Sequence, residues 1–276
     1  YASPGTYTVV LVTTNASGCQ DTVSQQVMIH AKPGVDFYND SLVCLGSVIT
    51  FYTDTVATLT GAVQQYNWNF GDGTAGSVQQ NATHTYLNAG SYLVTLSISD
   101  TLGCQNVAGH TVTIHPAPQS SFSYAQVCAG SPTLFTDLSL APAGDTITAW
   151  YWDFGLAGST DTSTQQHPQY TYLSGGTYTV TLTTTTEHGC SHSKSLPLQV
   201  WNTPTAYFSY TASPCANGAV QMHDSSWSYQ ATVQSWLWEF EPYQYGTGQN
   251  PSHVYYAIDS CYDVRLIVTD IRGCVD

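Results

Sequence analysis

Charged residues are scarce in this sequence, and basic residues are the scarcest. Only 8% of the 276 residues are Asp, Glu, Lys or Arg, compared with roughly 25% in ordinary soluble domains. Four Lys and Arg stand against 18 Asp and Glu, which gives a net charge of -14. A chain without a basic patch lacks the attraction that drives binding to nucleic acid or to anionic membrane surfaces, so both partner classes are excluded.

Long apolar runs, helical periodicity and catalytic motifs are also missing. No apolar run is long enough to cross a bilayer, so this segment is not expected to insert into a membrane. The sequence contains no Gly-x-Ser-x-Gly, no His-Glu-x-x-His, no phosphate loop and no Cys-x-x-Cys. We therefore predict no enzyme activity, no catalytic residue, no metal ligand and no cofactor. Calcium at the acidic turns or linkers is an alternative hypothesis.

What the sequence does contain is a repeated strand pattern. Large rings recur at every second residue in 66–70, 150–154 and 236–240, so they share one face of each expected strand. A second alternating strand, Tyr-x-Val-x-Leu, follows at 92–96, 178–182 and 262–266. Two apolar strand faces in each copy predict an all-β fold of tandem β-sandwiches.

A period of about 85 residues divides the chain into four expected repeats. The first repeat, 1–32, is expected to hold the last two strands of a partial domain. The second and third repeats, 33–116 and 117–202, are one domain each, and the fourth, 203–276, lacks its last strand. The boundary segments contain proline, which stiffens an extended connection. The chain does not begin with Met and has no signal peptide, so we expect a section of a longer array.

The best-preserved copy reads Trp68-Asn69-Phe70-Gly71-Asp72-Gly73-Thr74, followed by His84-Thr85-Tyr86 and a Gly-Cys pair at 103–104. This pattern resembles the PKD domain over the whole chain. The version with paired cysteines is similar to arrays in large bacterial surface proteins exported by type IX secretion. The fourth copy departs most, because Glu241-Pro242-Tyr243 replaces the Gly-Asp-Gly turn. The resemblance implies an immunoglobulin-like β-sandwich that serves as a spacer, a ligand-binding module or an adhesive stalk.

Polar residues recur at three sets of matching positions in the repeats, which we call columns. A structural role explains each column better than a catalytic role does. Acids near the central strand are expected to shape turns, because Asp bonds its own backbone; they are Asp72, Asp153 and Glu239. A His or Tyr column is expected to pack or to hydrogen-bond; it holds His84, Tyr170 and His253. A tyrosine column is expected to close a corner by bonding upstream backbone; it holds Tyr86, Tyr172 and Tyr255.

The eight cysteines recur at matching positions, which predicts disulfides and an oxidising compartment. One set precedes the second strand of a repeat: Cys44, Cys128 and Cys215. The other set lies at the hairpin before the last strand: Cys19, Cys104, Cys190 and Cys274. The obvious scheme pairs the two sets within each repeat. In an immunoglobulin-like strand order, however, those positions lie at opposite ends of strands about 20 Å long, whereas a disulfide needs Cα atoms within about 7 Å.

We therefore favour a staggered scheme over pairing within a repeat. It pairs Cys44 with Cys190, Cys128 with Cys274, and Cys215 with Cys261. Cys19 and Cys104 are then expected to have partners in repeats that precede residue 1. Every cysteine has a role in this scheme, whereas pairing within each repeat would leave Cys261 without a partner.

Two further groups of residues are candidates for modification or binding. Five Asp-(Ser/Thr)-aliphatic triplets resemble the O-glycosylation acceptor of bacteria that use type IX secretion; ordinary turn residues are the alternative reading. The acceptors would be Thr22, Ser41, Thr55, Thr101 and Thr146. Aromatic rings in loops and linkers are candidates for stacking on a glycan, although burial against a neighbouring domain or chain is favoured. These rings are Trp227, Tyr229 and Trp201.

Together these features predict a non-catalytic, disulfide-rigidified array on the outside of a bacterial cell. The leading hypothesis is an extracellular stalk or filament, secreted or at the cell surface, that acts in adhesion. Its expected partners are neighbouring copies or domains of the same long chain. The alternative is a set of glycan-binding or spacer modules of a secreted hydrolase, with a surface polysaccharide as the partner.

Overall fold

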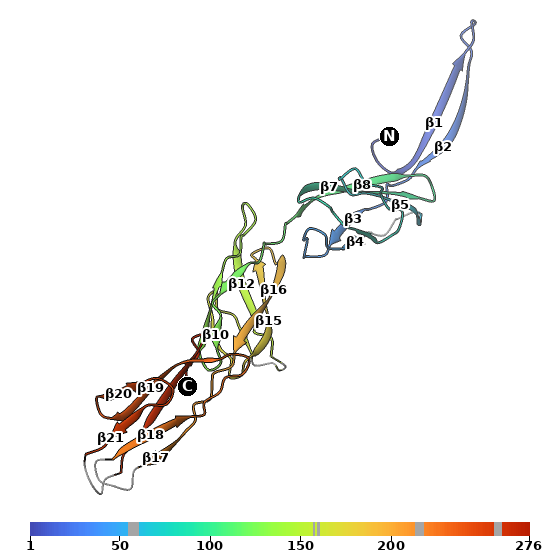
Figure 1. Ribbon diagram of the computed structural model, residues 1–276. Helices are drawn as coiled ribbons and strands as arrows, with labels where there is room; N and C mark the ends of the chain where they lie inside the picture. Colours follow the sequence, from blue (N-terminus) through green and yellow to red (C-terminus); the bar gives the residue numbers. More distant parts are fainter. Residues whose placement is uncertain (55–60, 157, 159–160, 213–217, 257–260) are drawn as a thin grey trace. The chain divides into compact units, whose positions relative to one another are not determined.

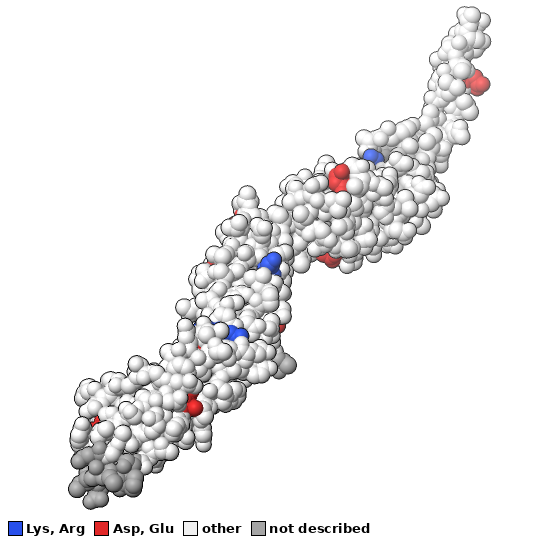
Figure 2. Space-filling model, in the orientation of Figure 1, with Lys and Arg blue, Asp and Glu red and all other residues white. Residues whose placement is uncertain are grey.

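The computed structural model describes residues 1–54, 61–156, 158, 161–212, 218–256 and 261–276. Within these residues every regular element is a β-strand, so the all-β class expected from the alternating rings is confirmed. The described residues hold no helix with the length and hydropathy needed to span a lipid bilayer. Charged groups are few and scattered on the face shown in Figure 2, as the composition requires.

The chain folds into two compact units that do not follow the repeat boundaries. The first unit comprises Tyr1–Ala117, Pro142–Asp145 and Thr186–Cys190. The second comprises Pro118–Ala141, Thr146–Thr185 and Ser191–Asp276. Two short loops of the third repeat are therefore part of the first unit, which also contains the whole second repeat.

The first unit begins with an antiparallel hairpin of β1 (Gly5–Thr14) and β2 (Gln20–Ile29), drawn in blue in Figure 1. Its apolar side chains stay exposed; Leu11, for example, is 60% accessible. The hairpin lies within residues 1–32, and its place as the end of a partial domain stays a prediction.

The second repeat follows as two three-stranded sheets, in the orders β3-β4-β6 and β5-β7-β8. The strands of the first sheet are β3 (Asp36–Asn39), β4 (Ile49–Asp54) and β6 (Ala82–His84). Those of the second are β5 (Val63–Asn69), β7 (Gly90–Asp100) and β8 (Gln105–Ile114). Trp68 and Phe70 are buried in a core with Phe51, Leu96 and Ile98, and Tyr66 packs against it. The period-two alternation of rings therefore places them on one inward face.

The second unit contains the sandwiches of the third and fourth repeats. In the third, the sheet β14-β11-β9 faces the sheet β10-β16-β15-β12-β13 across one core. Its strands are β9 (Phe122–Tyr124), β10 (Val127–Cys128), β11 (Pro132–Asp137), β12 (Ile147–Asp153), β13 (Thr162–Ser163), β14 (Gln169–Thr171), β15 (Gly176–Thr186) and β16 (Ser191–Trp201).

The fourth repeat has the sheets β17-β18-β21 and β20-β19-β22. Its strands are β17 (Phe208–Ala212), β18 (Ala219–Asp224), β19 (Val233–Glu241), β20 (Gln244–Thr247), β21 (Ser252–Val254) and β22 (Arg265–Asp270). Met222, Trp238 and Val268 are fully buried between the sheets. The same core plan thus recurs where the sequence pattern is weakest.

A buried tryptophan anchors each sandwich through a hydrogen bond as well as by packing. The indole N–H of Trp68 donates to the Gln79 carbonyl at 2.9 Å. Trp152 donates to Gln165 at 2.9 Å, and Trp238 to Gly248 at 3.0 Å. Because a buried donor without an acceptor is costly, this bond fixes the ring's orientation in the core.

The tyrosine corner is present in two repeats. The Tyr86 hydroxyl donates to the Phe70 carbonyl, and that of Tyr172 to Phe154, both at 2.9 Å. Burial raises the pKa of both hydroxyls above the ordinary value, which keeps them protonated as donors. The expectation for Tyr255 is wrong, because its buried hydroxyl has no hydrogen-bond partner among the described residues. The strand register shifts between Glu239 and Glu241, on either side of Phe240, whose carbonyl would be the equivalent acceptor.

Candidate functional site: the cysteine junctions

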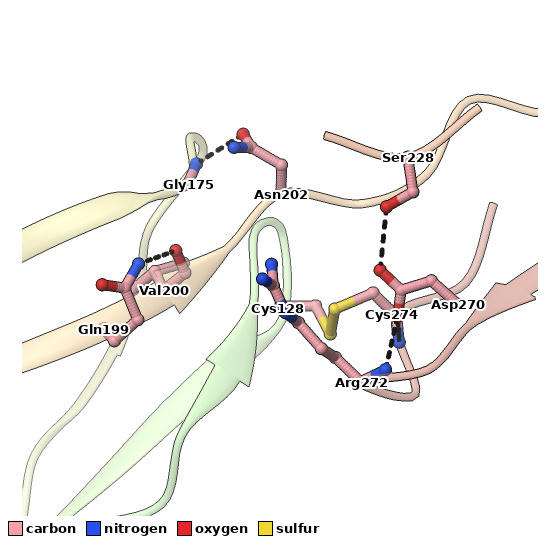
Figure 3. Close-up of a disulfide and its surroundings, with 9 residues drawn as sticks. All are labelled: Cys128, Gly175, Gln199, Val200, Asn202, Ser228, Asp270, Arg272 and Cys274. Carbon is pink, nitrogen blue, oxygen red and sulfur yellow. Dashed lines mark hydrogen bonds between the residues drawn. A yellow bond between two sulfur atoms is a disulfide. The ribbon is translucent and has the colours of Figure 1, made fainter. Parts of the chain in front are cut away.

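The hairpin that carries the second cysteine of a repeat is shaped by an acid four residues earlier. In the fourth repeat, Asp270 Oδ1 accepts the N–H groups of Arg272 at 2.9 Å and of Cys274 at 3.0 Å. Ser228 donates to the other carboxylate oxygen at 3.0 Å (Figure 3). Gly273 has φ of 84°, a left-handed conformation that favours glycine. The local sequence therefore sets the direction in which the cysteine points.

The same cap, which was not expected from the sequence, recurs in two of the other three hairpins, whereas the Cys190 hairpin has Thr186 at that position. Asp100 accepts the N–H groups of Leu102 and Cys104, and Asn15 accepts those of Ser17 and Cys19. The signal was available, since Asn or Asp stands four residues before three of the four Gly-Cys pairs.

The first cysteine of a repeat lies in a turn beside the end of the last strand. Cys44 forms a parallel bridge with His115. The Leu45 N–H donates to the His115 carbonyl at 2.8 Å, and the His115 N–H donates to Val43 at 2.9 Å. Cys128 pairs in the same way with Trp201. This turn therefore sits where its own repeat ends.

These positions explain why the first-turn cysteine and the last-hairpin cysteine of one repeat cannot pair. Cys104 precedes β8, whereas His115, the neighbour of Cys44, follows it. A strand of ten residues spans about 33 Å at 3.3 Å per residue. A disulfide needs Cα atoms within about 7 Å, so a Cys44–Cys104 bond would require the sandwich to unfold.

Two disulfides join the staggered cysteines instead. Cys44 bonds to Cys190 and Cys128 to Cys274, each with a Cα–Cα distance of 5.6 Å and a sequence separation of 146 residues. The first lies within the first compact unit, and the second, drawn in Figure 3, lies within the second unit. Cys190 and Cys274 are buried.

The remaining cysteines form no disulfide with a described residue. Cys19 and Cys261 are exposed, and Cys104 is half-buried. Cys215 lies outside the described residues, so its pairing with Cys261 stays a prediction. Partners for Cys19 and Cys104 in preceding repeats also stay a prediction.

A stacked pair of side chains accompanies each disulfide. At the second disulfide the Arg272 guanidinium lies 5.7 Å from the centre of the Trp201 ring and donates to the Gln230 carbonyl at 2.6 Å. At the first disulfide the rings of His115 and His188 stack with centroids 3.7 Å apart. Arg272 therefore occupies a face of Trp201, one of the three rings considered for glycan stacking.

A carboxylate completes the cluster at the first disulfide. His188 Nδ1 lies 3.2 Å from Asp145 Oδ2, and the Asp145 side chain is only 5% exposed. One donor atom from each of His115, Asp145 and His188 lies within 4.8 Å of the others, which is close enough for all three to hold one metal ion. The sequence analysis predicted no metal ligand, because these residues come from three separate segments without a recognisable spacing.

The His column packs and hydrogen-bonds, as expected. His84 stacks on Phe70 with ring centroids 4.1 Å apart, and its Nε2 lies 2.7 Å from Asp72 Oδ2. Burial by itself raises the pKa of Asp72, but hydrogen bonds from Thr74 and His84 outweigh it and lower the pKa from 3.8 to about 2.

The acids do shape turns, but they are not all equivalent. Asp153 Oδ1 accepts the Gly155 N–H at 2.8 Å, as Asn69 accepts that of Gly71 at 2.9 Å. Glu239 is not the counterpart of Asp72, because Glu241 is the acid paired with His253, at 3.3 Å. In the fourth repeat, the Glu-Pro-Tyr turn therefore places the acid of this pair at Glu241.

The other candidate residues lie at the surface. Thr22, Ser41, Thr101 and Thr146 are exposed, and Thr55 lies outside the described residues. Trp227 and Tyr229 are 58% and 55% exposed. Their modification and their binding to a glycan stay predictions.

The sequence profile of the PKD domain matches residues 30–116 and 115–200, which is more than half of the chain. The chain therefore belongs to the PKD domain family.

Several known proteins are similar over part of the chain. Collagenase ColA of Bacillus cereus is 40% identical over 78 residues, 28% of this chain and 8% of the collagenase. Polycystin-1 of Homo sapiens is 29% identical over 66% of this chain and 4% of its own length. Among solved structures, the PKD1 domain of the Vibrio cholerae metalloprotease PrtV is 26% identical, with a TM-score of 0.28, over 30% of this chain and 98% of that domain. The chain thus spans less than a tenth of either of these two curated relatives.

Asp72 is expected to make the second repeat sensitive to acid. Its folded pKa of about 2 lies below the ordinary value of 3.8, so the unfolded state takes up a proton first. This contribution to stability is present above about pH 4 and is lost as the pH falls through the folded pKa. Thermal unfolding between pH 5 and 2 should show a steeper loss for the natural chain than for Asp72→Asn. Parallel pH profiles would contradict the prediction, and Asp21→Asn, at an exposed acid, is the control.

Pepsin digestion at low pH, which blocks thiol exchange, is expected to give linked Cys44–Cys190 and Cys128–Cys274 peptides. Each bond closes a loop of about 150 residues, so changing both Cys44 and Cys190 to Ser should lower the free energy of unfolding by about 3–5 kcal/mol. Denaturant titration measures this, with Cys19→Ser as an exposed, unpaired control. A Cys44–Cys104 peptide would refute the staggered pairing.

Proposed function

We propose that this chain is a section of a non-catalytic, extracellular structural array, a stalk or filament of a secreted or cell-surface bacterial protein that acts in adhesion. The observation that carries the proposal is that each disulfide joins a cysteine of one repeat to a cysteine of the next. Such bonds reinforce connections along the chain. They also require an oxidising compartment, which supports an extracellular location.

The covalent topology supports a role under tension. The two disulfides create two nodes, Cys44 with Cys190 and Cys128 with Cys274. Three segments run in parallel between these nodes: 45–127, 129–189 and 191–273. When the ends are pulled apart, only the shortest segment can become taut. The other two, which contain most of the second and fourth repeats, stay slack, so force cannot draw them out.

Composition and surface chemistry support the same role. Only four Lys and Arg residues are present, so sites for trypsin-like proteases are rare. The exposed Asp-(Ser/Thr)-aliphatic triplets would carry glycans that hydrate a surface poor in charge. Together with the paired cysteines, they support export by type IX secretion as part of this proposal.

Pulling single molecules by their ends tests the array. With both disulfides intact, the fully stretched length should be about 370 Å, because only about 106 residues lie on the shortest covalent path at 3.5 Å each. Reduction should raise it to about 970 Å. The Cys44→Ser, Cys190→Ser double variant should give an intermediate length of about 450 Å. If the oxidised chain extended to its full length, the two disulfides would not limit extension, and the proposed role under tension would be refuted. Electron microscopy of native material without regular fibres would count against a filament.

A glycan-binding module of a secreted hydrolase is the second candidate. Trp227 and Tyr229 favour it, because they are more than half exposed and lie two residues apart in one loop. Exposed rings of this kind stack on sugar faces. Polysaccharide binding that is lost in Trp227→Ala but kept in Tyr245→Ala, an equally exposed ring of the same repeat, would favour this function. Absence of binding to any polysaccharide tested would favour the structural array.

A further inference from the structure

Three side chains of metal-binding type meet beside the first disulfide. His115 follows β8, Asp145 lies in the loop before β12, and His188 lies in the hairpin that carries Cys190. All three belong to the first compact unit. In the part of the chain that the structure describes, this is the one group of at least three His, Cys, Asp or Glu residues whose donor atoms converge.

Backbone contacts and the disulfide hold the three groups in place. His115 is bridged to Cys44, and Cys44 is bonded to Cys190, two residues after His188. The Cys190 sulfur lies 3.6 Å from the His115 carbonyl oxygen. The Asp145 N–H donates to the Pro142 carbonyl at 3.1 Å, which fixes the loop that carries the carboxylate. The backbone segments that carry the three donors are therefore held close together before any ion arrives.

The chemistry of the three donor atoms determines which class of metal ion they can bind. Two imidazole nitrogens and one carboxylate oxygen suit zinc and related first-row divalent ions, which take such ligands at about 2.0–2.2 Å. Calcium and magnesium prefer sites made only of oxygen atoms. Three protein ligands leave the fourth tetrahedral position to water, and the 39% exposure of His188 gives the ion access from solvent.

The second disulfide supplies an internal comparison without metal ligands. Trp201 occupies the position of His115 at the end of the last strand, and Arg272 occupies that of His188, two residues before the cysteine. Arg272 still stacks on Trp201. Stacking beside the disulfide therefore does not require histidine. Packing alone does not explain why two imidazoles and a carboxylate, a set able to bind a metal ion, meet at the first disulfide.

We propose that His115, Asp145 and His188 bind one zinc-class divalent cation, which adds a second, non-covalent cross-link beside the Cys44–Cys190 disulfide. The imidazole rings are within 13° of parallel in the stack, so they tilt apart to direct both nitrogen lone pairs at one ion. The surface position of His188 permits this movement. The proposal does not depend on the array acting in adhesion.

Zinc titration of the oxidised, metal-stripped chain tests the site. Calorimetry should show one equivalent bound, and Co²⁺ should give a visible absorption band that Zn²⁺ removes. Asp145→Asn should weaken binding at least tenfold. The double variant His115→Trp, His188→Arg copies the second junction, so it should keep both disulfides and lose the site. The chain stays oxidised throughout, and its free thiols, Cys19 and Cys104 among them, are alkylated beforehand, because thiolates would themselves bind zinc.

The other histidines provide the control. His223→Gln, at an exposed position in the fourth repeat, should bind zinc as the natural chain does. Absence of binding, or equal weakening in His223→Gln and Asp145→Asn, would overturn the proposal. If the double variant does not fold, nuclear magnetic resonance of the natural chain decides: zinc must shift the imidazole signals of His115 and His188, and shifts confined to other histidines would refute the site.

Discussion

The mismatch between the length of a sandwich and the reach of a disulfide governs the covalent structure of this chain. The turn of Cys44 is hydrogen-bonded beside His115, at the end of β8, whereas Cys104 precedes that strand. A ten-residue strand separates two cysteines of one repeat by roughly five times the distance that a disulfide can bridge. The first-turn cysteine and the last-hairpin cysteine of one repeat must therefore find their partners outside their own sandwich.

This constraint turns a repeating sequence into a staggered chain of cross-links. The first-turn cysteine of one repeat meets the last-hairpin cysteine of the next, so the same separation of 146 residues recurs in both bonds. At the second bond a hairpin cap fixes this geometry, because Asp270 accepts the N–H groups on both sides of Gly273. A bond that would otherwise staple one domain instead becomes part of the connection between domains.

The sequence predicted the parts of the structure that depend on the spacing of apolar residues and on the distance that a disulfide can span. Alternating rings placed Trp68 and Phe70 in the core, and strand length indicated that Cys44 pairs with Cys190. It could not predict contacts that arise when distant loops converge, such as Asp145 with His188, because no spacing connects them. It was wrong in the fourth repeat, where the strand register shifts between Glu239 and Glu241. There the Tyr255 hydroxyl has no hydrogen-bond partner among the described residues, and Glu241 is the acid paired with His253.

A comparison of the two disulfide junctions shows which features recur in both and which features differ. Both have a buried hairpin cysteine, a glycine of positive φ and a stacked pair of side chains. Only the chemistry of the stack differs: two imidazoles with a carboxylate at one, a guanidinium on an indole at the other. Because the disulfide already holds the backbone, the stack is not needed to form the junction. Side chains there can change without loss of the connection, so this is where successive repeats of one fold can acquire different ligands.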